Sequence, residues 1–298
     1  MTTAQDWNLS SRPSQKGSSD MAVKRLLKAP KAYKNAGFLG SRDARPIRIL
    51  SEFLEPLSRF NYYDVKDTIV FFGSARIKPR SETIKHLREL AKKGNKKNIH
   101  SKKYHEQLLQ AEVAVEMSRY YEDATELSRL ITAWSTKLKS KNRLLVCSGG
   151  GPGIMEAANK GAKLAKGESI GLNISLPFEQ FPNQYITPKF NMEFHYFFMR
   201  KFWFMFLGKA LVAFPGGFGT LDEFFELLTL LQTKKVGKKM TVILYGKNFW
   251  NKIVDFRALV KYGMISPEDM DLFSFADTPE EAFAILKKDL TKNYTEFR

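Results

Sequence analysis

A glycine-rich turn that runs directly into an acidic helix pattern contains the residue types best suited to chemistry. The stretch reads FPGGFGTLDEFFELLTLL and covers residues 214–231. Three glycines, Gly216, Gly217 and Gly219, precede two carboxylates. Glycine lets a backbone approach a ligand closely, and a helix that begins there directs unpaired N–H groups and partial positive charge outward. The pattern therefore predicts a site for an anion such as phosphate.

The side chains that follow the glycines indicate a reaction rather than simple binding. We expect Thr220 to cap the helix and to donate a hydrogen bond to a phosphate oxygen. Glu223 shares a helical face with Gly219 and Thr220, whereas Asp222 lies about 100° around the helix and should point elsewhere. A carboxylate beside a phosphate is repelled unless a cation stands near. Glu223 is therefore the candidate for chemistry.

The cation is expected in the aromatic stretch FHYFFMRKFWFMFLGKA, residues 194–210. Arg200 and Lys201 interrupt an otherwise apolar helix pattern, and a charge in such a helix is seldom buried without a partner. The aromatic residues around them are more typical of a core or a subunit interface than of a platform for a base. These aromatics include Tyr196, Phe197 and Trp203.

Two further glycine turns follow apolar runs, FFGSAR at 71–76 and SGGGPGIMEAANKGA at 148–162. In an open parallel sheet, ligands bind beyond the carboxyl ends of the strands, where such turns lie. We expect helix starts after Gly153 and after Gly219 to converge on one phosphate. The candidate phosphate-binding residues of the first two turns are Gly73, Ser74, Gly149, Gly150, Gly151 and Gly153.

The spacing of these glycines argues against the two commonest nucleotide fingerprints. Counting from Gly149, the sixth position of a G-x-G-x-x-G pattern is Ile154, and no G-x-x-x-x-G-K-[ST] sequence occurs. A mononucleotide therefore fits better than NAD or a nucleoside triphosphate.

Apolar runs alternate with helical patterns through most of the chain, which predicts an α/β fold with a parallel sheet covered on both faces. The predicted strands are 67–76, 143–150, 169–177, 210–217 and 241–246, and the predicted helices are 106–139, 153–166, 195–208, 219–234, 248–262 and 279–293. The expected fold class is a Rossmann-like, doubly wound parallel sheet flanked by helices, with a helical N-terminal extension.

The pattern divides the chain into a tail, an extension and a main domain. Residues 1–20 are polar and predict a flexible tail, and 21–66 predict a helical N-terminal extension whose apolar residues recur at helical spacing after Pro46. Residues 67–298 predict a Rossmann-like nucleotide-binding catalytic domain. Within it, the lysine-rich segment 77–104 is interpreted as a basic surface insertion that can form a helix at 81–93.

The positive charge is concentrated outside the strands and glycine turns. The formal net charge is +17, with basic residues frequent in 1–48 and in the segment KKGNKKNIHSKK. Solvated basic segments are the preferred interpretation, and a role in nucleic-acid binding is a minor alternative. The charge bears on solubility and weak attraction rather than on the reaction.

Composition places the protein among globular proteins of a reducing compartment. Hydrophobic residues make up 43% of the sequence, and the single cysteine, Cys147, excludes an intramolecular disulfide framework. With no recognisable signal peptide and no apolar run of membrane-spanning length, a cytoplasmic protein without membrane contact is expected. The histidines are scattered and form no ligand cluster with the cysteine, so neither a metal nor a cofactor is expected.

These motifs together resemble the LOG family, the cytokinin riboside 5′-monophosphate phosphoribohydrolases long labelled possible lysine decarboxylases. PGGFGTLDE matches the family's P-G-G-x-G-T-x-x-E signature, MRK matches its upstream Arg-Lys pair, and the resemblance covers roughly 67–262. It implies hydrolysis of the N-glycosidic bond of a purine nucleoside 5′-monophosphate, by an enzyme that is at least a homodimer. It also implies that Arg200 and Glu223 are catalytic. The residues it places along the substrate site are Lys201, Gly216, Gly217, Gly219, Thr220 and Thr229.

The sequence departs from the compact members of that family. It has FFMRK in place of M-H-x-R-K, so no histidine precedes Arg200 by two positions. The N-terminal extension, the basic insertion and a C-terminal helix resemble the larger bacterial members. An ordinary purine nucleotide such as AMP or GMP is therefore expected as a substrate at least as much as a cytokinin nucleotide.

The chemistry implied by the resemblance suits the residues. Cleaving an N-glycoside builds oxocarbenium character on the ribose, which a carboxylate such as Glu223 stabilises while it activates water. Arg200 would bind the phosphate or hold Glu223 by a bidentate contact. A lysine decarboxylase using pyridoxal phosphate is disfavoured, because nothing near Lys201 or Lys209 suggests a partner for the pyridine nitrogen. The alternative is a non-catalytic nucleotide-binding carrier or sensor on the same fold.

Overall fold

The computed structural model describes residues 28–97, 101–138, 143–177 and 181–294. The chain divides into two compact units, Met1–Arg45 and Pro46–Arg298. The described part of the first unit contains a short 3-10 helix, Ala32–Lys34, and α1, Ala36–Gly40, whose start is capped by a hydrogen bond from Phe38 N to Asn35 Oδ1. The predicted flexible tail, 1–20, lies outside the described residues.

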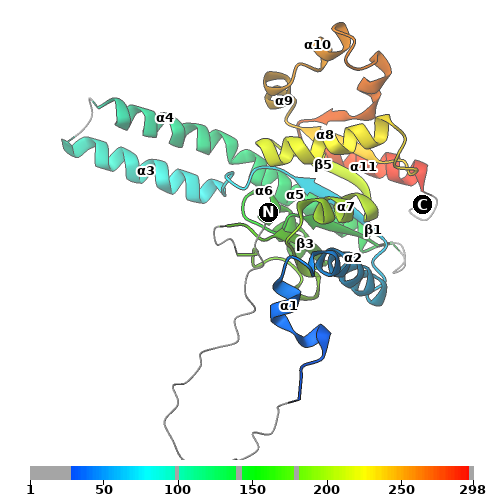
Figure 1. Cartoon of the computed structure of the whole chain (residues 1–298). Coiled ribbons are helices and arrows are strands. Elements are labelled where there is room, and N and C mark those ends of the chain that lie inside the picture. The colour runs from blue at the N-terminus through cyan, green and yellow to red at the C-terminus, as the bar shows by residue number, and fades with distance from the viewer. Residues whose placement is uncertain (1–27, 98–100, 139–142, 178–180, 295–298) are drawn as a thin grey trace, which may run out of the picture. The chain divides into compact units, whose positions relative to one another are not determined.

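The second unit is built on a seven-stranded parallel sheet with the order β4-β3-β2-β1-β5-β6-β7 (Figure 1). This confirms the predicted doubly wound parallel sheet. The strands are β1 Asp67–Phe72, β2 Leu144–Ser148, β3 Ser169–Ile174, β4 Asn191–Phe194, β5 Gly208–Ala213, β6 Thr241–Tyr245 and β7 Ser274–Ala276. The prediction missed β4 and β7, which are the short strands at the two edges.

Helices cover both faces of the sheet, and each face has its own apolar core. One core includes side chains from α2 Arg45–Tyr62, α7 Phe197–Leu207, α8 Phe218–Gln232, α9 Lys247–Ile253 and α10 Phe256–Lys261. The other includes side chains from α5 Arg119–Ser135, α6 Ile154–Leu164 and α11 Pro279–Asn293. The strand faces between them are almost entirely buried, as expected for a parallel sheet.

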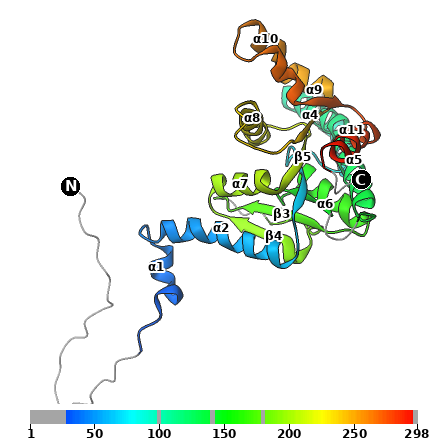
Figure 2. The same ribbon diagram turned by 90° about the vertical axis from the view of Figure 1, so that its right-hand side faces the viewer.

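The helix α2, at the end of the predicted extension, packs on the same face as α7. Arg59 of α2 donates a hydrogen bond of 3.0 Å to Asn191 O at the start of β4. Figure 2 shows α2 running beside β4 and close to α7. This part of the sequence therefore belongs to the compact unit that holds the sheet.

Two predicted helices are each divided in the structure. The predicted helix 106–139 is α4, Lys102–Met117, and α5, which meet at the buried Ser118. Because α4 packs along α3, Arg80–Lys97, rather than on the sheet, the two form a helical hairpin (Figure 1). The predicted helix 248–262 is α9 and α10, since Asp255 caps a new helix by accepting a hydrogen bond from Ala258 N.

The helices α5 and α6 approach each other closely at Gly161. A Cβ at this position would stand 2.1 Å from Thr125 O and 2.7 Å from Ser128 Cβ. The nearer atom is a backbone carbonyl, which cannot move aside as the end of a flexible side chain can. Glycine therefore sets the spacing of the helix that follows the second glycine turn.

Replacing Gly161 with alanine should destabilise the protein by about 1–3 kcal/mol, because overpacking outweighs the gain of about 1 kcal/mol in helix propensity. The free energy of unfolding in urea measures this. Gly237→Ala is the control, since a Cβ there would meet nothing within 4 Å; it should change stability by less than about 0.5 kcal/mol. A Gly161→Ala variant more stable than the wild type would contradict the close approach.

Candidate functional site

A cleft of about 740 Å³ lies at the carboxyl ends of β1 and β5. These strands flank the point where the strand order reverses, which is where open α/β sheets hold their ligands. The structure brings nine of the predicted site residues together around this cleft: Gly73, Ser74, Gly149, Arg200, Gly216, Gly217, Gly219, Thr220 and Glu223.

The three glycine turns are bonded to one another at the edge of the cleft. Ser74 N donates to Pro215 O at 3.0 Å, which joins the first turn to the third. Ile154 N donates to Ser74 O at 3.1 Å, which joins the second turn to the first. Gly153 has a φ of +71°, and a Cβ there would lie 2.3 Å from Ser74 O. The start of α6 is therefore occupied by the first turn.

Part of the second turn packs against the first turn and does not face the cleft. Gly149 lines the cleft, whereas Gly150, Gly151 and Gly153 do not.

The buried side-chain amide of Asn159 supports the second turn together with that of Asn183. Asn159 Oδ1 accepts hydrogen bonds from Ser148 Oγ at 2.7 Å and Asn183 Nδ2 at 2.9 Å. Asn183 Nδ2 also lies 3.0 Å from Gly150 O and 3.1 Å from Gly151 O, so the amide network fixes the turn's path.

The third turn leads into α8, which directs its N-terminus at the cleft. The N-cap residue is Gly217, with no side-chain cap bond, so the expectation that Thr220 caps the helix is wrong. Thr220 is instead the third residue of the helix, because α8 begins one residue earlier than predicted. The first bond of the turn runs from Leu221 N to Gly217 O. The amides of residues 218–220 precede it and have no acceptor within the helix, as an anion site requires.

A buried ion pair forms the floor of the cleft. Arg200 of α7 donates a hydrogen bond from its NH2 atom to Glu223 Oε1 of α8 at 2.9 Å, and the side chains are 11% and 12% exposed. The contact is a single bond rather than the bidentate pair considered above. The Arg200 guanidinium also lies against the rings of Phe197 and Phe204. Within the described residues, Arg200 Nε is buried and has no hydrogen-bond acceptor.

Burial controls the ionisation of this pair. Desolvation raises the pKa of Glu223 to about 7, and the positive charge of Arg200 opposes that rise. Desolvation likewise lowers the pKa of Arg200 from its ordinary value. Burial raises the pKa of the Cys147 thiol, which lies within β2, and the charge of Glu223 adds to that rise. Glu223 can therefore exchange a proton near neutral pH, as a general base must.

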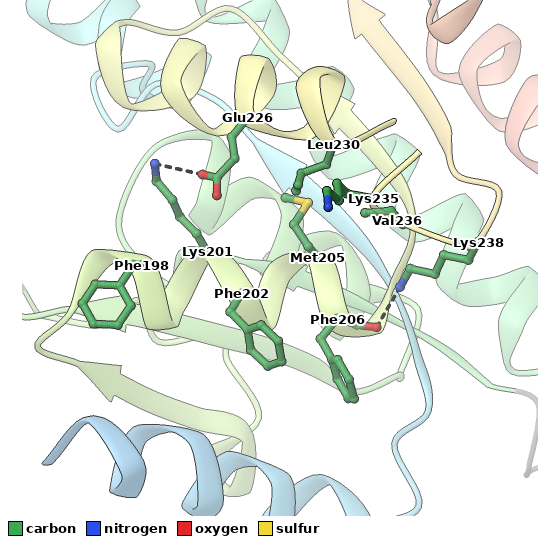
Figure 3. Close-up of a pocket in the computed structure, with 11 residues that line it drawn as sticks. Phe198, Lys201, Phe202, Met205, Phe206, Glu226, Leu230, Lys235, Val236 and Lys238 are labelled. Atoms are coloured by element: carbon green, nitrogen blue, oxygen red, sulfur yellow. Dashed lines mark hydrogen bonds and ion pairs between the residues drawn. The ribbon is translucent and has the colours of Figure 1, made fainter. Parts of the chain in front are cut away.

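Lys201 and Thr229 do not line the cleft. Lys201 Nζ lies 2.7 Å from Asp222 Oδ2 and 2.9 Å from Glu226 Oε2, which ties α7 to α8 outside the cleft. Figure 3 shows Lys201 directed toward Glu226 of α8, whereas the rings of Phe198 and Phe202 extend from α7 away from α8. Thr229 borders the same outer surface. Asp222 faces away from the cleft, as its position on the helix predicted.

Apolar side chains complete the cleft, and sequence reasoning assigned them no role there. Tyr196 and Trp203 are buried in the core, but Phe197 is half exposed and lines the cleft. The other apolar lining residues include Met155, Leu176, Phe218 and Ile253. Arg76, in the first turn, adds a positive charge to the lining. Its place in FFGSAR was the available signal, since the turn itself was recognised.

Among the described residues, no group of three or more His, Cys, Asp or Glu side chains could hold a metal ion. No helix in the described ranges combines the length and the apolar character that crossing a membrane requires.

The raised pKa of Glu223 should appear in the pH dependence of stability. The folded protein binds this proton more tightly than the unfolded chain, where a glutamate titrates at about 4.3. The contribution of Glu223 is thus fully present below that pH and is lost as the pH rises through about 7. Relative to Glu223→Gln, the free energy of unfolding of the wild type should fall by on the order of 3 kcal/mol over this range. A difference that does not change with pH would contradict the buried carboxyl group.

Comparison with solved structures finds weak likenesses. The molybdenum cofactor binding protein from the phototrophic bacterium Rippkaea orientalis is 20% identical, with a TM-score of 0.41 over 57% of this chain and 88% of its own. The molybdenum cofactor carrier protein from Chlamydomonas reinhardtii is 19% identical, with a TM-score of 0.42 over 76% of this chain and 99% of its own. At these values the likenesses carry no conclusion about function. No curated protein sequence matched the chain.

Comparison with family models identifies one family. The model described as "Possible lysine decarboxylase" matches residues 155–286. The matched range contains both members of the buried ion pair and the whole of the third glycine turn. The first turn and the glycines Gly149, Gly150, Gly151 and Gly153 of the second precede it. Over residues 155–286 this match bears out the predicted resemblance to the LOG, or possible lysine decarboxylase, family.

Proposed function

We propose that the protein hydrolyses the N-glycosidic bond of a purine nucleoside 5′-monophosphate and releases the free base and ribose 5-phosphate. The observation that carries the proposal is the buried Arg200–Glu223 pair, which lies on the floor of a cleft beside the N-terminus of α8. A carboxylate placed next to an anion site is unfavourable for simple binding, and a neighbouring arginine makes the arrangement tolerable. Such a pair suits a reaction in which positive charge develops on the sugar.

The phosphate would be held at the start of α8. The amides of residues 218–220 face the cleft without a helical acceptor, and the helix dipole adds a favourable potential for an anion. The exposed Arg76 offers a further donor in the lining of the cleft. Binding energy from this remote group would place the ribose for reaction without taking part in the bond that breaks.

Glu223 would act on the water and on the sugar. In the reaction the water oxygen adds to C1′ of the ribose, and the bond from C1′ to the base nitrogen breaks with its electron pair leaving on the base. Glu223 takes a proton from the water, and the departing base gains a proton. The carboxylate also stabilises the oxocarbenium character of the transition state. Arg200 keeps enough of Glu223 ionised for this role near neutral pH.

The apolar part of the cleft would hold the base. Phe197, Phe218 and Leu176 provide apolar and aromatic surface in the lining of the cleft. Such surface accepts adenine, guanine or a base with an apolar substituent. Both ordinary purine nucleotides and cytokinin nucleotides are therefore candidate substrates.

The proposal is tested by incubating the full chain with AMP, GMP and a cytokinin nucleotide and measuring free base by chromatography. Glu223→Gln should lower kcat by about 10²- to 10⁴-fold with little loss of nucleotide binding. Asp271→Asn is the control, because this exposed carboxylate lies outside the cleft and does not act on Glu223, and it should leave kcat near that of the wild type. The rate should also rise with pH through about 7, as Glu223 loses its proton.

The same experiment separates the alternative function. Tight nucleotide binding without release of base from any of the three would favour a non-catalytic carrier or sensor. Unchanged turnover in Glu223→Gln would remove this residue from the mechanism even if base were released.

We further propose that the protein is a homodimer in the cytoplasm, joined through the outer face of α7. Phe198, Phe202 and Phe206 recur along this face with 51%, 38% and 49% exposure. They line a groove of about 530 Å³ that is closed on its other side by α8 and residues 235–238 (Figure 3). A stripe of three aromatic rings on one helix can pack on its own symmetry copy, which buries apolar area on both chains at once.

Phe202→Glu should abolish this association, because it places a charge at the centre of the apolar stripe. Light scattering after size-exclusion chromatography should show a dimer for the wild type and a monomer for the variant. Leu109→Glu is the control, since Leu109 is an exposed apolar residue on α4, away from the groove. A monomeric wild type at micromolar concentration would contradict the proposed dimer.

A further inference from the structure

The helix α2 braces the helix that carries Arg200. Trp203 of α7, which is almost fully buried, donates its indole N–H to Glu52 O at 2.9 Å. The ring of Phe53 lies 5.6 Å from that of Phe202 and 5.8 Å from that of Trp203. These contacts join α2, which precedes the family domain, to the element that holds half of the ion pair.

The carboxylate of Glu52 also caps the N-terminus of α7. Its Oε1 accepts a hydrogen bond from His195 N at 2.8 Å, and its Oε2 accepts one from Tyr196 N at 3.2 Å. Tyr196 is the N-cap residue of α7, a position where a short polar side chain is usual. A glutamate that bonds the N-cap amide also reproduces one half of a capping box, here supplied from another helix. The negative charge of Glu52 also interacts favourably with the positive end of the α7 helix dipole.

Arg200 lies one turn beyond this cap. Arg200 N donates to Tyr196 O at 3.2 Å, so the capped residue and Arg200 share the first turn of the helix. At the end of its side chain, Arg200 donates a hydrogen bond to Glu223 Oε1. The place of the guanidinium therefore depends on a turn that Glu52 holds in register.

We propose that Glu52 is a positioning residue that sets Arg200 against Glu223, and that α2 is thereby part of the functional unit. The inference rests on the proposed function, because it assigns Glu52 an effect on that reaction. It gives a purpose to the helix at the end of the N-terminal extension, which lies outside the residues matched by the family.

Glu52→Ala tests the inference, with Glu55→Ala as the matched control. Glu55 lies one turn further along α2 and pairs with Arg59 of the same helix instead of α7. Glu52→Ala should lower kcat by about tenfold to a hundredfold, the usual cost of a displaced catalytic group, with a smaller change in KM. Glu52→Gln keeps an acceptor for one amide and should lie between Glu52→Ala and the wild type. The control should match the wild type.

A pH profile separates positioning from general loss of stability. The groups whose charges act on Glu223 are Arg200, Asp222, Lys201 and Glu226, and the thiol of Cys147 lies near. Arg200 opposes the protonation of Glu223, so a displaced Arg200 should move the acid limb of kcat to higher pH in Glu52→Ala. In an Arg200→Ala background, Glu52→Ala should cause no further loss of kcat. Lower thermal stability with unchanged kcat and an unchanged acid limb would overturn the proposal.

A measurement without turnover distinguishes failure of this inference from failure of the proposed function. If the wild type releases no base, the hydrolase proposal fails on its own. The titration of Glu223 can still be followed by NMR of the carboxyl carbon in the wild type, Glu52→Ala and Glu55→Ala. A higher Glu223 pKa in Glu52→Ala alone supports the positioning role, and equal values in all three proteins overturn it.

Discussion

The rest of the site depends on the burial of the Arg200–Glu223 ion pair, because both charges have lost most of their contact with water. A buried ion pair repays its desolvation only when its geometry is held closely. Here one member comes from α7 and the other from the start of α8, so both helices must be fixed relative to each other. Lys201, which bonds to α8 through Asp222 and Glu226, and the shared apolar core beneath both helices provide that fixation.

The fold supplies the two helices from different parts of the sheet. The helix α7 leaves the edge strand β4 and leads to β5 beside the centre, whereas α8 follows β5 directly. The position of Glu223 thus follows from a short connection, and that of Arg200 from a longer crossing that needs support along its length. The aromatic contacts between α7 and α2 provide this support. The apolar residues of α7 therefore hold the helix in place, and Arg200 and Lys201 make the ionic contacts with α8.

Periodicity and glycine placement were sufficient to predict the five central strands, the face shared by Glu223 and Gly219, and the pairing of Glu223 with a cation in residues 194–210. The edge strands were missed because β4 and β7 are too short to show a pattern. The break at Ser118 was missed because apolar residues continue across it, and only the packing of α4 on α3 separates the helices. The sequence could not show that Gly153 makes room for the backbone of the first glycine turn. A glycine that lets a neighbouring backbone approach looks the same in the sequence as one that lets a ligand approach.

The burial of the single cysteine has a practical consequence. Cys147 is the residue before the last in β2 and is 2% exposed. Burial raises its pKa, so almost none of it is in the thiolate form that alkylating reagents attack. Maleimide can reach this sulfur only when the centre of the sheet opens. The rate of labelling therefore reports how often the sheet opens at β2, near Glu223, and it can be measured without any change to the natural sequence.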